Sequence, residues 1–179
     1  MIKKRREIII TSPSRLHLGF YGFDDHYGYK YGSMGLAINA HKTIISVKHS
    51  QSVVSDLPKK YILPLIKYLE LKGLKSNFEI KILQKSPSHI GLGSGTQLSL
   101  SIGMAICKLF NLNLGVNDIA NLYNRGKRSG TGISIFKQGG FVVDACKKDR
   151  LLPRDMFKSK FPKDWRIIIL NDTKLKGTF

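Results

Sequence analysis

The stretch Pro87-Ser88-His89-Ile90-Gly91-Leu92-Gly93-Ser94-Gly95-Thr96 decides the fold, because it joins an alternating segment, Asn77–Leu83, to an apolar run over 97–110. The alternation predicts a strand, and the run predicts a helix. Glycine permits positive φ and close approach of a ligand. A helix that starts after such a loop directs unpaired N–H groups and its positive end into the same space. The loop therefore predicts a phosphate site, with a ligand-free turn capped by Ser or Thr as the alternative.

The candidate phosphate ligands in this loop are Gly91, Leu92, Gly93, Ser94, Gly95 and Thr96. The helix that follows is apolar around most of its circumference, which predicts that it is buried in the middle of the domain. A buried helix terminus is costly unless something satisfies its N–H groups. This cost favours a bound anion over an empty turn.

A second basic and glycine-rich segment, Arg125-Gly126-Lys127-Arg128-Ser129-Gly130-Thr131-Gly132, follows a predicted helix over 117–124. Three cations and three glycines in eight residues predict a second anion-binding segment. Its candidate ligands are Arg125, Lys127, Arg128, Ser129 and Gly130.

Near the N-terminus, a short predicted strand over Glu7–Ser12 is interrupted by Pro13. The next segment, Ser14–Tyr21, alternates apolar and polar residues as a half-buried strand does. Arg15 and His17 therefore share one face, where they could line a pocket for an anion or a carboxylate. The alternative is a solvated polar face.

The other expected elements are simpler. Strands are predicted over 34–38 and 43–48, joined around 39–41, and a helix over Leu57–Leu71 ends at Gly73. A strand over 141–144 is followed by a connection over 147–163 and a strand over Trp165–Leu170. The segment Phe23–Ser33 predicts a loop or lid, in which Asp24, Asp25 and His26 are candidate metal ligands of non-standard spacing.

Composition places the chain among globular proteins. Of its 179 residues, 42% are hydrophobic and 23% are charged, which argues against disorder and allows one domain with a sizeable core. Thirty Lys and Arg against twelve Asp and Glu give a net charge of +18. Such a charge attracts polyanions, including nucleic acid and phosphorylated metabolites.

Cysteine usage and hydropathy bear on location. Cys107 and Cys146 lack metal-binding spacing, and two isolated thiols suit a reducing cytoplasm. We expect no signal peptide and no membrane span.

These motifs together resemble the β-ribofuranosylaminobenzene 5′-phosphate synthase family, a non-kinase branch of the GHMP kinase superfamily used in archaeal methanopterin synthesis. The glycine loop resembles the second motif of that superfamily. Segments 12–19, 32–38 and 125–132 also resemble the synthases, in the same order. The resemblance implies an α+β fold of the ribosomal protein S5 domain 2-like type, with a mixed sheet and helices on one face. Residues 1–163 would form the N-terminal domain, and 164–179 would begin a second lobe that is otherwise absent.

The sequence departs from the kinase pattern where a kinase needs carboxylates. Ser134 stands near the position of the kinases' catalytic Asp, Asn124 near that of their metal-binding Glu, and Gly95 replaces a loop serine. Phosphoryl transfer needs Mg²⁺ ligands and a group that positions the nucleophile. These departures argue against a kinase.

The resemblance implies a different reaction, in which phosphoribosyl pyrophosphate and p-aminobenzoate form a C–C bond with loss of CO₂ and pyrophosphate. Cations and backbone N–H groups would stabilise the departing pyrophosphate, Arg15 would pair with the aromatic carboxylate, and His17 would transfer a proton. Mg²⁺ is expected with the pyrophosphate, with Asp24 and Asp25 as the nearest candidates. A homodimer stays open, and the alternative functions are an ATP-dependent small-molecule kinase and a basic nucleic-acid-binding module.

Overall fold

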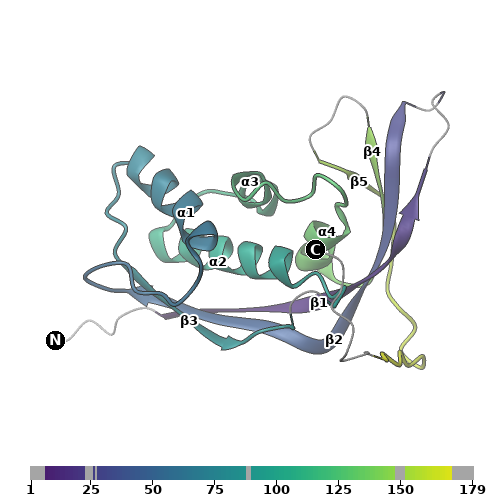
Figure 1. Cartoon of the computed structure of the whole chain (residues 1–179), viewed down its shortest axis with the longest axis horizontal. Coiled ribbons are helices and arrows are strands. Elements are labelled where there is room, and N and C mark those ends of the chain that lie inside the picture. The colour runs from purple at the N-terminus through teal and green to yellow at the C-terminus, as the bar shows by residue number, and fades with distance from the viewer. Residues whose placement is uncertain (1–6, 23–25, 27, 88–89, 148–151, 171–179) are drawn as a thin grey trace.

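Two long antiparallel strands organise the computed structural model, which describes residues 7–22, 26, 28–87, 90–147 and 152–170. They are β1 (Glu7–Tyr21) and β2 (Tyr29–His49), and they pair along most of their lengths. Figure 1 shows that both strands bend sharply, so that the sheet wraps around the helices. The bend gives β2 two further partners, one for each half.

One half of β2 pairs with β3 (Phe78–Gln84), and the other half pairs with β4 (Phe141–Lys147), which carries β5 (Arg154–Ser159) at the sheet edge. These named pairs are antiparallel, and an isolated parallel bridge joins Val54 to Glu79. The sheet is therefore mixed, as expected.

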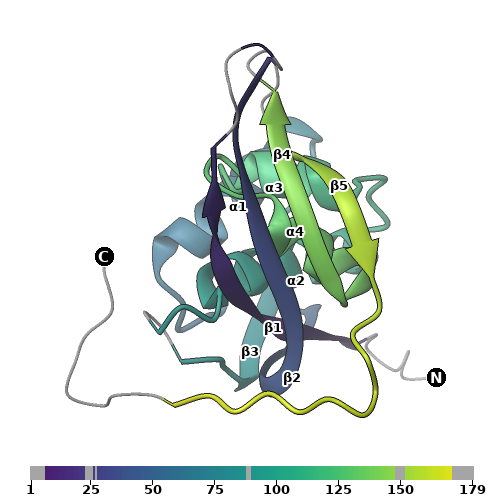
Figure 2. The same ribbon diagram turned by 90° about the vertical axis from the view of Figure 1, so that its right-hand side faces the viewer.

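The four helices found among the described residues lie on one face of the sheet (Figures 1 and 2), which confirms the predicted α+β architecture. They are α1 (Lys59–Leu71), α2 (Ser94–Phe110), α3 (Val116–Leu122) and α4 (Thr131–Gln138). The central helix α2 contacts β1, β2 and the other helices. Its residues Leu100, Ile102 and Ile106 are fully buried, so the prediction of a buried helix is confirmed.

Several predicted boundaries are wrong for physical reasons. Pro13 does not end β1, because a register shift between Ser12 and Ser14 absorbs it. The predicted strands over 34–38 and 43–48 are one strand, because His41 adopts a φ of 56° and the chain continues without a turn. Both long strands use local irregularities where the sequence suggested breaks.

The region after β4 also differs from expectation. Arg154–Ser159, expected to be a connection, forms edge strand β5. Trp165–Leu170, expected to be a strand, has no strand assignment, and Ile168 is 84% exposed. Among the described residues, no helix is long and apolar enough to cross a membrane.

Candidate functional site

The glycine loop and the start of α2 line an open cavity. Gly91 and Gly93 have φ values of 78° and 66°, a left-handed conformation that favours glycine. Gly93 caps α2, and no side-chain hydrogen bond among the described residues caps it. The N–H of Thr96 donates to the carbonyl of Gly93. Ser94 and Gly95, the first two residues of the helix, line the cavity without the Ser or Thr cap that the alternative interpretation required.

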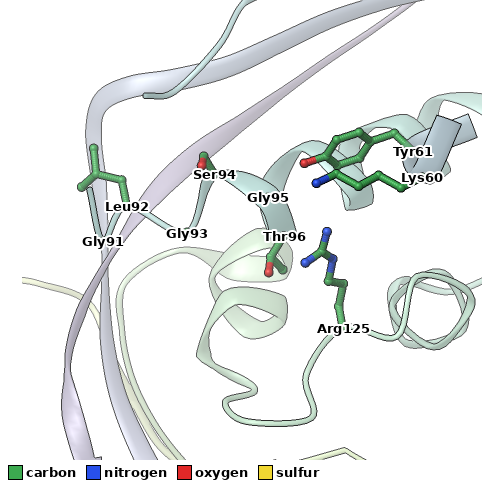
Figure 3. Close-up of a pocket in the computed structure, with 9 residues that line it drawn as sticks. All are labelled: Lys60, Tyr61, Gly91, Leu92, Gly93, Ser94, Gly95, Thr96 and Arg125. Atoms are coloured by element: carbon green, nitrogen blue, oxygen red, sulfur yellow. The ribbon is translucent and has the colours of Figure 1, made fainter. Parts of the chain in front are cut away.

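Three polar side chains from two other segments point at this helix start (Figure 3). They are Lys60 and Tyr61 of α1, and Arg125 after α3. A side-chain carbon placed on Gly95 would lie 3.7 Å from both terminal nitrogens of Arg125 and 3.8 Å from the Tyr61 hydroxyl. Arg125 also donates to Ser99, with 3.3 Å between Nε and Oγ.

In this arrangement the positive charge of Arg125 lies close to the positive end of the α2 dipole. The guanidinium of Arg125 lies over the first turn of α2, where the helix dipole is itself positive. No acidic side chain among the described residues lines this glycine-loop cavity, which has a volume of about 300 Å³. An anion between the helix and Arg125 would relieve the repulsion, so the geometry favours a phosphate-type ligand.

Arg15 of β1 lies beside the same loop. Its backbone N–H donates to Leu92, 3.0 Å away, and its Nε lies 3.1 Å from the position of a side-chain carbon on Gly93. Its Nη1 donates to Thr131 Oγ1 at 3.0 Å. Nε is buried and has no hydrogen-bond partner among the described residues. Burial lowers the pKa of Arg15, and the charge of Asp144 raises it in part.

His17 shares the face of Arg15, as predicted, and packs against an aromatic side chain that the sequence did not single out. The ring centroids of His17 and Phe20 lie 4.4 Å apart, at an interplanar angle of 59°. Both imidazole nitrogens are buried without a hydrogen-bond partner among the described residues. Burial lowers the pKa of His17, and the charge of Arg15 lowers it further.

A second cavity, the arginine cavity, brings the two predicted basic segments together. Its volume is about 440 Å³, within the range of small-molecule sites. It is lined by Arg15, His17, Phe20, Thr96, Asn124, Arg125, Gly126, Lys127, Arg128 and Ser129. Thr96 and Arg125 also line the glycine-loop cavity, so the two cavities adjoin.

Most of the predicted site residues therefore lie in one continuous region. Leu92 is almost fully buried, so its contribution to the cavity wall is mainly its backbone. Gly130 is the exception, because it lines neither cavity and its N–H donates to Asp144. Asp24 and Asp25 lie outside the described residues.

The described residues contain no group of three or more His, Cys, Asp or Glu side chains that could hold a metal. Neither cavity wall includes a described carboxylate. Ser134, near the position of the kinases' Asp, donates to Asp155 of β5 and lines neither cavity. The described wall therefore does not fit a protein-bound Mg²⁺.

Sequence reasoning missed Lys60 and Phe20, because exposed residues of a helix or strand carry no spacing signal for a site. Tyr61 was missed because this partly buried residue belongs to the apolar pattern of α1. It also missed Asp144, which stands behind the arginine cavity and is fully buried. A carboxylate in an otherwise apolar predicted strand was the available signal.

Comparisons with known proteins bear on the family and the fold of the chain. Residues 57–140 match the family model of the GHMP kinases N terminal domain. The chain is 36% identical to the β-ribofuranosylphenol 5′-phosphate synthase of Methanocaldococcus jannaschii, over 76% of this chain and 46% of the relative. It is 33% identical to the synthase of the same name from Archaeoglobus fulgidus, over 95% of this chain and 58% of the relative. The chain thus spans about half the length of these curated relatives.

Solved structures share the fold at low identity. A mevalonate kinase from Methanococcus jannaschii aligns with a TM-score of 0.58 and 21% identity, over 85% of this chain and 56% of that one. A sugar kinase from Campylobacter jejuni aligns with a TM-score of 0.67 and 16% identity, over 91% of this chain and 61% of that one. The chain belongs to the GHMP kinase superfamily and, within it, to the family of the β-ribofuranosylphenol 5′-phosphate synthases.

Proposed function

We propose that this chain forms the substrate-binding lobe of a synthase that joins the phosphoribosyl group of phosphoribosyl pyrophosphate to an aromatic acid. The observation that carries the proposal is the composition of the arginine cavity. Four cations, Arg15, Arg125, Lys127 and Arg128, share its wall with the His17–Phe20 pair. Such a wall suits two substrates bound side by side, one that carries phosphate groups and one that carries an aromatic ring.

The proposed reaction balances without an added reagent. The ring carbon that carries the carboxylate attacks C1 of the ribose, and the bond from C1 to the pyrophosphate oxygen breaks. The bond to the carboxylate then breaks, its electron pair returns to the ring, and CO₂ leaves. Because no proton is gained or lost overall, the main electrostatic task is to stabilise the pyrophosphate as it departs.

The cations and the start of α2 have the right chemistry for this task. Arg125 lines both cavities, so it can contact an anion that extends from the first turn of α2 into the arginine cavity. The Lys127 and Arg128 side chains are exposed at the mouth of that cavity. Guanidinium groups bind phosphate oxygens in a bidentate manner, which fixes orientation as well as charge.

Arg15 and His17 would contact the aromatic acid and also the pyrophosphate, because they share one cavity wall with Arg125, Lys127 and Arg128. The buried, unpartnered Nε of Arg15 calls for an acceptor, and a carboxylate supplies one. His17 has a lowered pKa, so it is neutral near pH 7 and can accept one hydrogen bond and donate another. Phe20 is 58% exposed in the wall beside it and offers a face for the ring of the acid.

Mg²⁺ stays in this proposal as an ion that accompanies the pyrophosphate, with Asp24 and Asp25, outside the described residues, as its candidate protein ligands. Pyrophosphate oxygens would also hold it, since the described cavity walls offer it no carboxylate. The same absence of carboxylates from the described walls weighs against ATP-dependent phosphoryl transfer.

The curated relatives are named for a phenol product. A decarboxylative reaction that yields a phenol starts from p-hydroxybenzoate, and one that yields an aniline starts from p-aminobenzoate. We propose an aromatic acid with a para hydroxyl or amino group as the acceptor. A direct competition between the two acids measures the preference.

The experiment follows the carboxyl label of each acid. The purified chain is assayed alone and after mixing with the part of the Archaeoglobus fulgidus relative that this chain does not match. Release of labelled CO₂ that requires phosphoribosyl pyrophosphate is expected. Label release without that substrate, or ATP turnover with a hydroxylated metabolite, would contradict the synthase. RNA affinity that falls steeply with salt would support a nucleic-acid-binding module instead.

A matched pair of variants distinguishes the effect of a cavity residue on pyrophosphate binding from the effect of the protein's net charge. Arg125→Gln should abolish pyrophosphate binding by the chain, because Arg125 lines both cavities. Arg154→Gln removes an equal charge from edge strand β5, where the residue lines neither cavity, and should bind pyrophosphate like the parent. Equal losses in both variants would place pyrophosphate elsewhere.

A further inference from the structure

Asp144 of β4 is a fully buried carboxylate behind the arginine cavity. Among the described residues, no Lys, Arg or His nitrogen lies within ion-pair distance of it. A buried charge without a cation is costly unless hydrogen bonds satisfy it. We therefore expect hydrogen bonds that compensate the burial of the Asp144 carboxylate.

Donors from two segments fill both carboxylate oxygens. Oδ1 accepts from the backbone N–H and the hydroxyl of Ser33, each at 2.8 Å, and Oδ2 accepts from the N–H of Gly130. Burial raises the pKa of Asp144, while hydrogen bonds from Ser33, Gly130 and Thr131 lower it in part. Asp144 thus connects strand β2 to the turn that precedes α4.

A line of hydroxyl groups continues from Asp144 to the cavity. Ser33 Oγ lies 2.6 Å from Ser129 Oγ, which lies 2.7 Å from Thr131 Oγ1. Nη1 of Arg15 lies 3.0 Å from Thr131 Oγ1 and 3.4 Å from Ser129 Oγ. Each hydroxyl in this hydroxyl chain is within hydrogen-bond distance of the next group.

The two ends of the hydroxyl chain fix its direction. The single hydroxyl hydrogen of Ser33 goes to Asp144, so Ser129 must donate to Ser33 and Thr131 must donate to Ser129. Thr131 is then an acceptor toward Arg15, which is what a guanidinium requires, because it can only donate. A carboxylate at position 144 is the terminal acceptor that makes this direction consistent.

We propose that Asp144 is a positioning residue of the anion site, which orients the guanidinium of Arg15 through the hydroxyls of Ser33, Ser129 and Thr131. This inference rests on the proposed function only in taking pyrophosphate as the ligand. Asp144 also holds the turn that follows Lys127 and Arg128 through the N–H of Gly130. Two walls of the arginine cavity thus depend on one buried side chain.

The sign of the effect on binding distinguishes positioning from simple charge. Asp144→Asn removes a negative charge near a cationic site, so Coulomb effects alone would tighten pyrophosphate binding. Positioning predicts the opposite. The amide nitrogen of Asn must face either Ser33 or Gly130, both of which donate, so one connection is lost. We expect the affinity for pyrophosphate to fall by about tenfold.

Asp155→Asn is the matched control, because Asp155 pairs directly with Asp144 across the β4–β5 ladder. Its carboxylate contacts Ser134, Gln138 and Lys158 and lines neither cavity. This variant should bind pyrophosphate as tightly as the parent or more tightly. Thermal unfolding of each variant confirms that the proteins compared are folded.

Ser129→Ala tests the hydroxyl chain at the residue through which both of its contacts with Arg15 pass. If Asp144 acts on Arg15 through Ser129, the double variant of Asp144→Asn and Ser129→Ala should bind pyrophosphate about as weakly as the weaker single variant. Additive losses in a calorimetric titration would overturn the hydroxyl chain, and unchanged or tighter binding by Asp144→Asn would overturn the positioning role. Failure of the parent chain to bind pyrophosphate would instead count against the proposed function.

Discussion

At the scale of single residues, Gly93 matters for two reasons: its backbone is left-handed, and its lack of a side-chain carbon lets Arg15 lie against the loop. Gly93→Ala should destabilise the protein by about 1–2 kcal/mol, the cost of a side chain in this conformation. The added carbon would also lie 3.1 Å from Nε of Arg15, so Arg15 must shift and pyrophosphate affinity should fall. Chemical denaturation and calorimetric titration measure the two effects.

Gly73→Ala is the matched control for backbone strain. Gly73 has a φ of 68°, close to the 66° of Gly93, and an added carbon there meets nothing within 4 Å. It should lose similar stability and keep its affinity for pyrophosphate. If Gly93→Ala also keeps full affinity, the contact between Arg15 and the loop does not shape the site.

His17 should make pyrophosphate binding depend on pH. In the protein without ligand, burial and the charge of Arg15 lower the pKa of the His17 imidazole below its ordinary value of 6.5. Stability from neutral His17 is therefore present above pH 6.5 and is lost as pH falls through the lowered pKa. A bound anion favours the charged imidazole, so binding in this acidic window should take up a proton at His17.

Calorimetry of pyrophosphate binding in two buffers of different ionisation enthalpy measures this proton uptake. The difference between the parent and His17→Gln isolates the imidazole from the titration of pyrophosphate itself. His49→Gln serves as control, because His49 packs against Phe110 and lines neither cavity. Equal proton uptake by the parent and His17→Gln would exclude His17 from the bound site.

The sequence predicted the chemical character of individual site residues better than it predicted which residues they contact. The shared face of Arg15 and His17 follows from strand alternation alone, and both residues line the arginine cavity. That Arg15 meets Thr131 across 116 residues could not be predicted, because this contact depends on how distant segments pack. Asp144 was missed for the same reason, since its donors come from positions 33 and 130.

At the scale of secondary-structure elements, the packing of α2 on α3 fixes the helix whose start forms the site. Gly103 of α2 is where the two helices meet, because an added carbon there would lie 2.2 Å from Cγ2 of Ile119. Gly103→Ala should therefore destabilise the protein by about 1–3 kcal/mol through overpacking. This loss occurs although alanine favours a helix over glycine by about 1 kcal/mol.

A double-mutant cycle with Ile119→Ala tests the contact. Ile119 is fully buried, so Ile119→Ala alone should cost about 2–5 kcal/mol. In the double variant the new methyl group has room, and the sum of the single losses should exceed the double loss by about 0.5–3 kcal/mol. Additive losses in urea denaturation would show that the two helices do not meet at this position.

Elements with a strong periodic pattern were predictable, and those stabilised by their surroundings were not. The apolar run over 97–110 predicted most of α2. Helix α4 was hidden because glycines flank it, and it forms through burial of Ile133 and Ile135. Edge strand β5 is mostly exposed and lacks apolar alternation, whereas the apolar run Trp165–Leu170 pairs with no described strand.

At the scale of the whole molecule, the net charge of +18 should raise the local concentration of anions at the site. Two kinds of lysine contribute. Lys60 lines the glycine-loop cavity, whereas Lys72, Lys75 and Lys108 are exposed near the far ends of α1 and α2. Lys72 is separated from Lys60 by a helix length of about 18 Å. Salt should separate the two contributions, because the Debye length is about 30 Å at 0.01 M and about 10 Å at 0.1 M.

The triple variant Lys72→Gln, Lys75→Gln and Lys108→Gln should weaken pyrophosphate binding several-fold near 0.01 M salt and match the parent at about 0.3 M, where distant charges are screened. Lys60→Gln should weaken binding at both salt concentrations, because its charge acts at short range inside the cavity. Calorimetric titration of all three proteins at both concentrations makes the comparison. A loss by the triple variant that persists at high salt would mean that the distant lysines act through structure, and the whole-molecule charge would then have no part in ligand capture.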